Sequence, residues 1–258
     1  KEGTSRRDED RFFKMRDKRG ILITGASSET GMALIRKIGM NYTHVIAHYN
    51  KSAEGIRSLN HELGGRIIPV QADFSSRESI EDMICKIREK ELIIDHIVHL
   101  AAPGFHLQKF AKEDIDEIRK EYISSAESIM IILKEFITDM SRRKYGKAVF
   151  MLSSNVTGYP AGYQLSYTVS KYALLGLMKS IAVEYAGKGI TSNAVSPDMM
   201  DTKFVSGIPE LIVRQNAESS PCKRNLYVEE VITAFEYLLS DGADRVTGIN
   251  IPVTGGRF

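Results

Sequence analysis

The sequence has little cysteine: only Cys85 and Cys222 occur among 258 residues. Two cysteines are too few for a disulfide framework or a zinc site, and such scarcity is typical of a reducing cytoplasm. No run approaches the ~20 consecutive apolar residues that a membrane-spanning helix needs, and none resembles a signal peptide. The formal net charge of +2 gives no reason to expect a nucleic acid or a membrane surface as partner. We therefore expect a cytoplasmic protein that holds no metal and binds neither nucleic acid nor membrane.

The charge pattern divides the chain into a short tail and one large domain. Residues 1–19 form a dense mixed-charge run with few apolar side chains, which is typical of a tail or linker. Beyond Arg19, no low-complexity segment or internal repeat interrupts the sequence. Residues 20–258 are therefore predicted to form a single domain.

Strand-like and helix-like segments alternate through that domain. Strands are predicted at 20–26, 43–49, 65–73, 96–102, 147–154, 190–197 and 249–253. Helices are predicted at 32–40, 53–63, 76–90, 112–141, 164–187 and 228–240. This alternation predicts an α/β fold of the Rossmann type, a doubly wound parallel sheet of about seven strands with helices on both faces. Such sheets bind ligands at the carboxyl ends of their strands, where the strand order reverses.

A glycine-containing turn, TGASSETG (24–31), follows the first predicted strand and opens a helix. Gly25 permits a tight turn, and Gly31 lets the helix pack closely on the strand. The helix N-terminus then offers N–H groups and a positive dipole end to a pyrophosphate. The spacing differs from the general G-x-G-x-x-G fingerprint, so an ordinary turn between a strand and a helix stays open as the alternative.

The window after this turn bears on which dinucleotide is bound. An NAD site usually has an acidic residue about 20 positions further on, to hold the ribose hydroxyls. No acidic residue occurs between Glu29 and Glu54, whereas the window holds several basic ones: Arg36, Lys37, His44, His48 and Lys51. This pattern favours NADP over NAD. A solvated basic helix face is the alternative, and it accounts for Arg36 and Lys37 better than for Lys51.

The segment SYTVSK (166–171) places Tyr167 one helical turn before Lys171, on the same helix face. A lysine ammonium beside a phenol lowers the pKa of the phenol, which makes Tyr167 a candidate proton donor or acceptor. A chain with 11 tyrosines holds roughly one such pair by chance. Ser154, at the end of the fifth predicted strand, lies 13 residues before Tyr167.

Taken in order, these motifs resemble those of the short-chain dehydrogenase/reductase family, from residue 20 to residue 258. TGASSETG resembles the family's TGxxxGxG turn, and SYTVSK resembles its YxxxK. NAVSPDMMDT (193–202) resembles N-x-V-x-P-G with its following threonine, and VTGINIPVTGG (246–256) resembles ITGxxxxVDGG. The resemblance implies hydride transfer between a nicotinamide and a carbonyl or alcohol carbon. It assigns Ser154 to the substrate oxygen, Tyr167 to protonation of the alkoxide, and Lys171 to the nicotinamide ribose and to the pKa of Tyr167.

The resemblance also implies a nicotinamide dinucleotide as cofactor, NADP(H) before NAD(H). Asp73 matches the family's adenine contact, and AHYNKS (47–52) resembles the NADP-reading turn of the 3-oxoacyl-carrier-protein reductases. The expected cofactor-binding residues are Gly25, Ser27, Ser28, Thr30, Gly31, Tyr49, Asn50, Lys51, Asp73, Phe74, Ala101, Ala102, Tyr167, Lys171, Pro197 and Thr202.

Three positions depart from the family pattern. Glu29 stands where the family most often has its middle glycine, and IVHLAAP (97–103) replaces LVNNAG. The family commonly has an Asn in the helix after the fourth strand, where it holds a water in a proton relay to the lysine. Here that place falls on Tyr122, and Ser124 or Ser125 replaces the Asn only if the helix shifts. We therefore expect a reduced or rerouted relay.

The similarity to 3-oxoacyl-carrier-protein reductases suggests an acidic acyl carrier protein as partner. Arg142, Arg143 and Lys188 are candidate docking residues beside the cleft, and a solvated loop is the alternative. The segment 199–221 corresponds to the family's variable lid. Its apolar members either line an acyl channel or form a small packed helix: Phe204, Val205, Ile208, Leu211 and Ile212. The resemblance also implies a homotetramer or homodimer built on the helices around 112–141 and 164–187.

Three functions remain open at this point. The first is an NADPH-dependent ketoreductase that acts on a β-ketoacyl thioester in fatty-acid-like or secondary-metabolite biosynthesis. The second keeps the fold but acts on a small polar, sugar-like or cyclic ketone. The third is a weakly catalytic, cofactor-binding structural or regulatory partner, which Tyr122 and the segment HLAA motivate.

Overall fold

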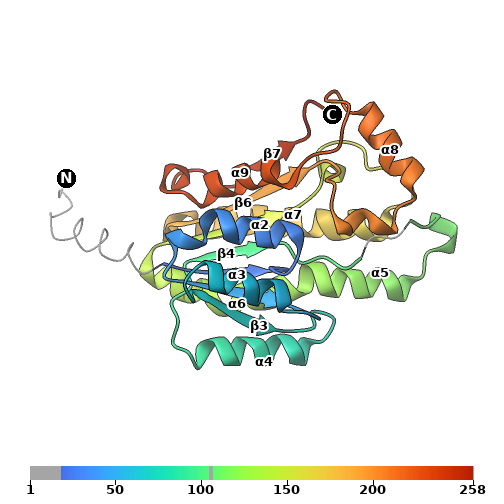
Figure 1. Ribbon diagram of the computed structural model, residues 1–258. Coiled ribbons are helices and arrows are strands. Elements are labelled where there is room, and N and C mark those ends of the chain that lie inside the picture. The colour runs from blue at the N-terminus through green and yellow to red at the C-terminus, as the bar shows by residue number, and fades with distance from the viewer. Residues whose placement is uncertain (1–18, 105–106, 258) are drawn as a thin grey trace.

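The computed structural model describes residues 19–104 and 107–257, which form one seven-stranded parallel sheet covered by helices (Figure 1). The strands are β1 Gly20–Thr24, β2 His44–Tyr49, β3 Ile67–Gln71, β4 His96–His99, β5 Gly146–Met151, β6 Ile190–Pro197 and β7 Asn250–Val253. Their order across the sheet is β3-β2-β1-β4-β5-β6-β7. The predicted doubly wound fold is thereby confirmed.

Helices cover both faces of the sheet. The α-helices are α2 Glu29–Ile38, α3 Glu54–Glu62, α4 Arg77–Arg88, α5 Ile115–Tyr122, α6 Ser128–Arg143, α7 Leu165–Tyr185, α8 Glu210–Ser219 and α9 Val228–Leu239. Helices α2, α3 and α9 pack on the core that contains Ile21 and Ile23 of β1, whereas α4, α6 and α7 pack on the core that contains Leu22. Successive side chains of a strand point to opposite faces, so one apolar strand supplies both cores.

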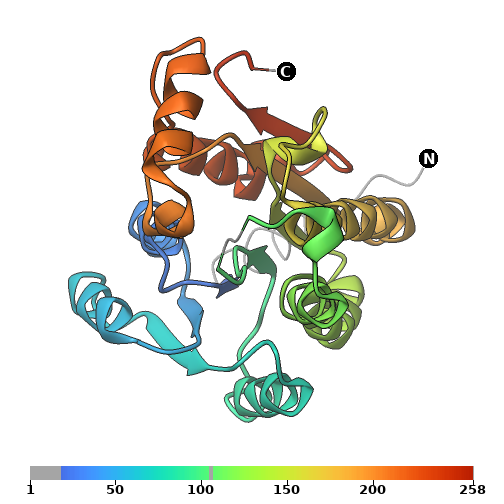
Figure 2. The same ribbon diagram turned by 90° about the vertical axis from the view of Figure 1, so that its right-hand side faces the viewer.

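The strand order reverses between β1 and β4, which pair in parallel with Thr24 opposite His99. Each strand of a parallel sheet ends at the same edge, and that edge faces the viewer in Figure 2. The rule for such sheets places a ligand beside this reversal. No helix within the described ranges 19–104 and 107–257 is long and apolar enough to cross a membrane.

Some local features differ from the sequence prediction. The helix predicted over 112–141 is divided into α5, a five-residue π-helix at Ile123–Glu127, and α6. Arg19, predicted to belong to the tail, is part of the folded domain: its Nη1 lies 2.8 Å from Oδ1 of Asp241, and its carbonyl accepts from the Thr43 N–H at 3.0 Å. The rest of the predicted tail lies outside the described residues.

Candidate active site

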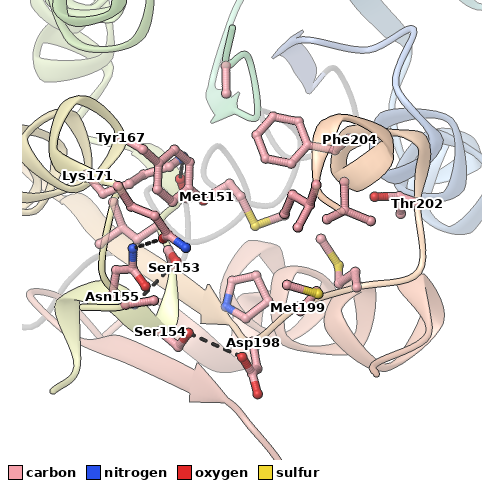
Figure 3. A pocket seen from close by; sticks show the side chains of 18 of the residues that line it. Met151, Ser153, Ser154, Asn155, Tyr167, Lys171, Asp198, Met199, Thr202 and Phe204 are labelled. Atoms are coloured by element: carbon pink, nitrogen blue, oxygen red, sulfur yellow. Dashed lines mark hydrogen bonds between the residues drawn. The ribbon is translucent and has the colours of Figure 1, made fainter. Parts of the chain in front are cut away.

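A cavity of about 740 Å³ lies at the carboxyl edge of the sheet (Figure 3). Its walls come from segments far apart in the sequence: the turn after β1, the end of β5, helix α7 and the segment after β6. The cavity extends from Ser28 at the start of α2, past Tyr167 on α7, to Arg257 near the C-terminus. It therefore lies where the strand order predicts a ligand site.

Tyr167 and Lys171 lie on the same face of α7 and line this cavity, as the four-residue spacing predicts. The Lys171 side chain is buried, and its Nζ donates to the carbonyl of Met151 at 2.9 Å. The same Nζ lies 5.3 Å from the centroid of the Tyr167 ring. The end of β5 therefore fixes the ammonium beside the phenol.

The serine that is hydrogen-bonded to Tyr167 is Ser153, whereas the predicted Ser154, which also lines the cavity, is the next residue along the chain. The buried Ser153 hydroxyl is hydrogen-bonded to the phenol of Tyr167. Ser154 begins a 3-10 helix, and its Oγ turns to Oδ1 of Asp198 at 3.5 Å (Figure 3). Counting 13 residues back from Tyr167 assumes a fixed length for the loop before α7. The strand positions the serine instead: the N–H of Leu152 still bonds to Val195 of β6 at 2.8 Å, and Ser153 comes next.

Burial governs the acidity of the tyrosine and the lysine. Burial raises the pKa of Tyr167 to about 12. The hydrogen bond from Ser153 lowers this pKa, and the charge of Glu121 raises it. Burial also lowers the pKa of Lys171 to about 8, which the Glu121 charge partly counters. The expected lowering of the Tyr167 pKa by Lys171 is not found, because burial raises this pKa and the charge of Glu121 raises it further. Tyr167 is a protonated acid at neutral pH, and Lys171 loses its proton not far above it.

Glu121 places a buried carboxylate near this pair. Its side chain is only 7% exposed, and its charge acts on both Tyr167 and Lys171. Glu121 lies on α5 directly before Tyr122, which packs partly buried against the core. The π-helix begins at the next residue, Ile123, and changes the direction in which the following side chains point. This is the helix shift that Ser124 or Ser125 needs in order to replace the family's asparagine.

Inside the π-helix, the carbonyl of Ser125 accepts from Nε2 of His99 at 2.7 Å. Nδ1 of His99 lies 2.8 Å from Oγ1 of Thr24, so the histidine joins β1, β4 and the π-helix. In the family motif this position is an asparagine. The predicted departure at HLAA is thus a structural link between the sheet and the helix that carries Glu121.

The turn after β1 has the geometry that its glycines predict. Gly25 has φ +68°, and a Cβ there would lie 2.8 Å from the N of Ala101. A Cβ on Gly31 would lie 2.6 Å from the carbonyl O of Gly25. Ser28 caps α2 by accepting from the Gly31 N–H at 3.0 Å. Both glycines are required because the helix starts directly against the ends of β1 and β4.

Half of the predicted cofactor-binding residues line the cavity: Ser27, Ser28, Thr30, Ala102, Tyr167, Lys171, Pro197 and Thr202. The other eight are not among its lining residues: Gly25 and Gly31 at the turn after β1, Ala101 after β4, Tyr49, Asn50 and Lys51 at the end of β2, and Asp73 and Phe74 after β3. Strands β2 and β3 are paired, so their ends are neighbours. Hydrogen bonds from Ser75 lower the pKa of Asp73, and the charge of Lys51 lowers it further, which places Lys51 near Asp73.

These residues fit a dinucleotide. The N-terminus of α2 and the Tyr167–Lys171 pair share one cavity, so a pyrophosphate at the helix end leaves a nicotinamide room to reach the phenol. One feature opposes an anion there. Glu29, an acidic residue in the first turn of α2, also lines the cavity.

The segment after β6 forms the opposite wall. It contains a 3-10 helix, Lys203–Gly207, and then α8. Four of the five predicted apolar residues line the cavity, and Leu211, which is 54% exposed, does not: the four are Phe204, Val205, Ile208 and Ile212. The ring of Phe204 lies 6.2 Å from that of Tyr167, centroid to centroid. The two alternatives for this segment, an acyl channel wall and a small packed helix, are therefore each met in part, because the segment includes a helix and also lines the cavity.

The predicted carrier-docking residues do not flank this cavity within one chain. Arg142 and Arg143 end α6 and precede β5, and Lys188 precedes β6, so all three lie at the amino edge of the sheet. Arg143 is also engaged there, since its Nε donates to Oδ1 of Asp95 at 3.0 Å. The cavity lies at the opposite edge because the strands are parallel.

Four residues of the site were not predicted from the sequence: Ser153, Glu121, Asp198 and Arg257. Asp198 and Arg257 pair at one end of the cavity, where Nη1 of Arg257 lies 3.0 Å from Oδ2 of Asp198. The motif carried a signal for Asp198, which stands where N-x-V-x-P-G has glycine. Arg257 follows the matched C-terminal motif directly. Neither Ser153 nor Glu121 had a signal, since each depends on local geometry.

Together, the fold and the site define an oxidoreductase with a dinucleotide cleft and a tyrosine–lysine pair. A protein-family model described as "Enoyl-(Acyl carrier protein) reductase" matches residues 26–257. The chain belongs to the short-chain dehydrogenase/reductase family, whose members bind a nicotinamide cofactor and act on CH–OH and C=O groups.

Curated relatives cover nearly the whole chain. The chain is 28% identical over 239 residues to the 3-oxoacyl-[acyl-carrier-protein] reductase FabG of Buchnera aphidicola, covering 92% of this chain and 96% of the relative. It is 30% identical over 249 residues to the oxidoreductase UcpA of Salmonella typhimurium, covering 91% and 92%. Among solved structures, a putative gluconate dehydrogenase of Agrobacterium tumefaciens superposes with a TM-score of 0.85 at 23% identity, over 93% of this chain and 96% of the other.

Proposed function

We propose that this protein is an NADPH-dependent ketoreductase and that its substrate is a β-ketoacyl thioester. The observation that carries the proposal is the grouping of Ser153, Tyr167 and Lys171 in one cavity with the N-terminus of α2. The names of several relatives support the substrate class, because they are 3-oxoacyl-[acyl-carrier-protein] reductases.

Tyr167 is the proton donor in this mechanism. Its pKa of about 12 keeps the phenol protonated at neutral pH, and an alkoxide is a stronger base than a phenolate. The proton therefore moves from the Tyr167 hydroxyl to the substrate oxygen as negative charge develops there. Bound NADPH supplies the hydride to the carbonyl carbon.

Ser153 and Lys171 position this step. The Ser153 hydroxyl lies against the phenol, so a carbonyl oxygen placed between the two accepts a hydrogen bond from each. The Nζ of Lys171 is held by the carbonyl of Met151 and is charged at neutral pH, given its pKa of about 8. In this position it stabilises the phenolate that remains after proton transfer and is available to a ribose hydroxyl. Glu121 is the buried carboxylate near both groups, and we propose it as the next member of the proton route.

The preference for NADPH rests on the end of β2. Tyr49 ends that strand, Asn50 and Lys51 follow it, and no acidic residue lies between Glu29 and Glu54 to hold a ribose diol. Lys51 provides a cation near Asp73, at the expected adenosine end of the site. NADPH is therefore expected to bind more tightly than NADH, and Lys51→Gln is expected to reduce this preference.

A small hydroxylated ketone is the second candidate substrate. The paired Asp198 and Arg257 side chains favour it, because they give the cavity a polar end that an unsubstituted acyl chain does not need.

The function is tested by titrating the protein with NADPH and NADH and then measuring reduction of acetoacetyl thioester, hydroxyacetone and crotonyl thioester. Reduction of the acetoacetyl thioester, with loss of that activity in Tyr167→Phe, supports the proposal, and reduction of hydroxyacetone alone supports the second candidate. Reduction of the crotonyl carbon–carbon double bond alone contradicts it and favours enoyl reduction. Full ketone reduction by Tyr167→Phe removes the assigned role of the phenol.

A further inference from the structure

The cavity has a polar end built by Asp198 and Arg257. The Asp198 side chain, 11% exposed, accepts from Nη1 of Arg257 at 3.0 Å. The same Nη1 donates to Oδ1 of Asn216, and Nη2 donates to Oγ of Ser219 at 2.7 Å. Helix α8 therefore holds the guanidinium from one side while the carboxylate holds it from the other.

The sheet itself brings the two residues together. Strands β6 and β7 are paired, with Pro197 opposite Val253, and the N–H of Asp198 donates to the carbonyl of Val253 at 3.0 Å. After β7, Gly255 and Gly256 have φ +62° and +92°, and this turn carries Arg257 back toward Asp198. The arrangement is thus set by the sheet edge and a glycine turn.

Hydrogen-bonding capacity remains at this end of the cavity. A guanidinium has five N–H donors, and the three bonds above use three of them. Oδ1 of Asp198 faces Oγ of Ser154 at 3.5 Å, which is longer than the 2.5–3.0 Å typical of an O–H···O bond. A ligand group placed here can donate to the carboxylate and accept from Ser154 or Arg257.

The charges select the kind of group. Asp198 repels a substrate carboxylate, Arg257 repels an ammonium, and together they are close to neutral. An uncharged group that both donates and accepts satisfies all three side chains. We propose that Asp198 and Arg257 form a specificity subsite for a hydroxyl or amide group of the substrate, beyond its reacting carbonyl. This inference rests on the proposed ketoreductase function.

Two substrate pairs test the inference and show whether the subsite binds a hydroxyl group or an amide group. Hydroxyacetone and acetone differ by one hydroxyl. Acetoacetyl N-acetylcysteamine carries an amide, and ethyl acetoacetate carries none. Initial rates give kcat/KM for all four substrates with wild type, Asp198→Ala, Arg257→Gln and a control variant, Arg214→Gln. Arg214 suits the control because its exposed side chain pairs with Glu218 on the same helix α8. Asp198→Asn, which is nearly isosteric, replaces Asp198→Ala if the latter does not fold.

Wild type is expected to prefer the substituted member of at least one pair, and both subsite variants are expected to lose about tenfold of that preference. Their activity on the plain ketone should change less than about twofold, and Arg214→Gln should resemble wild type. A loss confined to hydroxyacetone identifies a small hydroxyketone, and a loss confined to the cysteamine thioester identifies the amide-bearing arm of an acyl thioester. Equal losses on both members of each pair, or no loss, overturn the inference.

Failure of the proposed function gives a different result. In that case wild type reduces none of the four ketones. Saturation-transfer NMR then reports binding without turnover. The measured quantity is the ratio of saturation transfer to hydroxyacetone over transfer to acetone. A lower ratio in Arg257→Gln than in wild type still supports the subsite, and an equal ratio in the two proteins rejects it.

Discussion

The carboxylate of Glu29 accepts a hydrogen bond from the backbone N–H of Lys203 at 2.7 Å. Glu29 belongs to the first turn of α2, at the expected pyrophosphate site, and Lys203 begins the 3-10 helix of the opposite wall. The next residue, Phe204, contacts the Tyr167 ring. The residue that departs from the family's glycine therefore ties the cofactor turn to the segment over the active site.

Glu29→Ala is expected to loosen that segment. Alanine removes the acceptor of the Lys203 N–H, so amide hydrogen exchange over residues 203–207 should accelerate about tenfold, whereas Glu29→Gln keeps an acceptor oxygen and should change less. Hydrogen-exchange mass spectrometry measures both. Glu54→Ala, an exposed first-turn acidic residue of α3, is the control. Wild-type exchange in Glu29→Ala would show that the bond does not restrain the wall.

The two adjacent serines are expected to differ strongly. Ser153→Ala removes the hydroxyl that bonds to Tyr167 and should lower kcat on ethyl acetoacetate by about 100-fold, the usual cost of one donor to a developing oxyanion. Ser154→Ala should change that kcat by less than about twofold, because its hydroxyl faces Asp198. Steady-state kinetics on the two purified variants decide the matter. The reverse order would restore the assignment that the 13-residue count predicts.

The sequence predicted the fold well where burial alone sets the pattern. Strand β6, eight residues that are all buried, has the bounds that its residues predict. The predicted fifth strand ended at 154, but β5 ends at Met151, because the polar Ser153–Ser154 pair follows the same apolar run. Because the strand was predicted to run three residues too far, its end did not show which of the two serines faces Tyr167.

Other features depend on contacts that no local pattern encodes. The π-helix contains Ser125, whose carbonyl accepts a hydrogen bond from His99 of β4, 26 positions away. Asp198 and Arg257 lie 59 positions apart and meet because β6 and β7 are paired. Neither relationship is periodic, so neither was predictable before the sheet order was known.

Glu121→Gln is expected to shift the pH dependence of reduction to lower pH. The charge of Glu121 raises the pKa of both Tyr167 and Lys171, so its removal lowers both. Reduction requires the protonated phenol and the ammonium, which are lost as pH rises. The alkaline limb of the kcat profile should therefore begin at lower pH than in wild type. Glu117→Gln, on the exposed side of α5 beside Lys120, is the control. An unmoved limb, or one at higher pH, contradicts a role for the Glu121 charge.

Buried histidines, His48 and His99 among them, are expected to make the fold sensitive to acid. Burial lowers the pKa of His99 to about 3, and the charge of Lys171 lowers it further; burial lowers that of His48 to about 4. In the unfolded chain both titrate near 6.5. Because the folded pKa values are depressed, the neutral rings stabilise the fold fully above pH ~6.5, and this stability is lost as pH falls. From pH ~7 to ~5, each histidine should cost about 2 kcal/mol of unfolding free energy.

Urea unfolding at the two pH values, with wild type and His99→Asn, tests this. The variant loses the bonds to Thr24 and Ser125 and should be less stable at pH ~7. Its further loss on acidification should nevertheless be smaller than that of wild type by about 2 kcal/mol, because one depressed histidine is gone. The comparison of slopes isolates His99, since every other titrating group is common to both proteins. Equal slopes would mean that His99 does not stay neutral in the folded protein, and the link between β4 and the π-helix would then have to involve a charged ring.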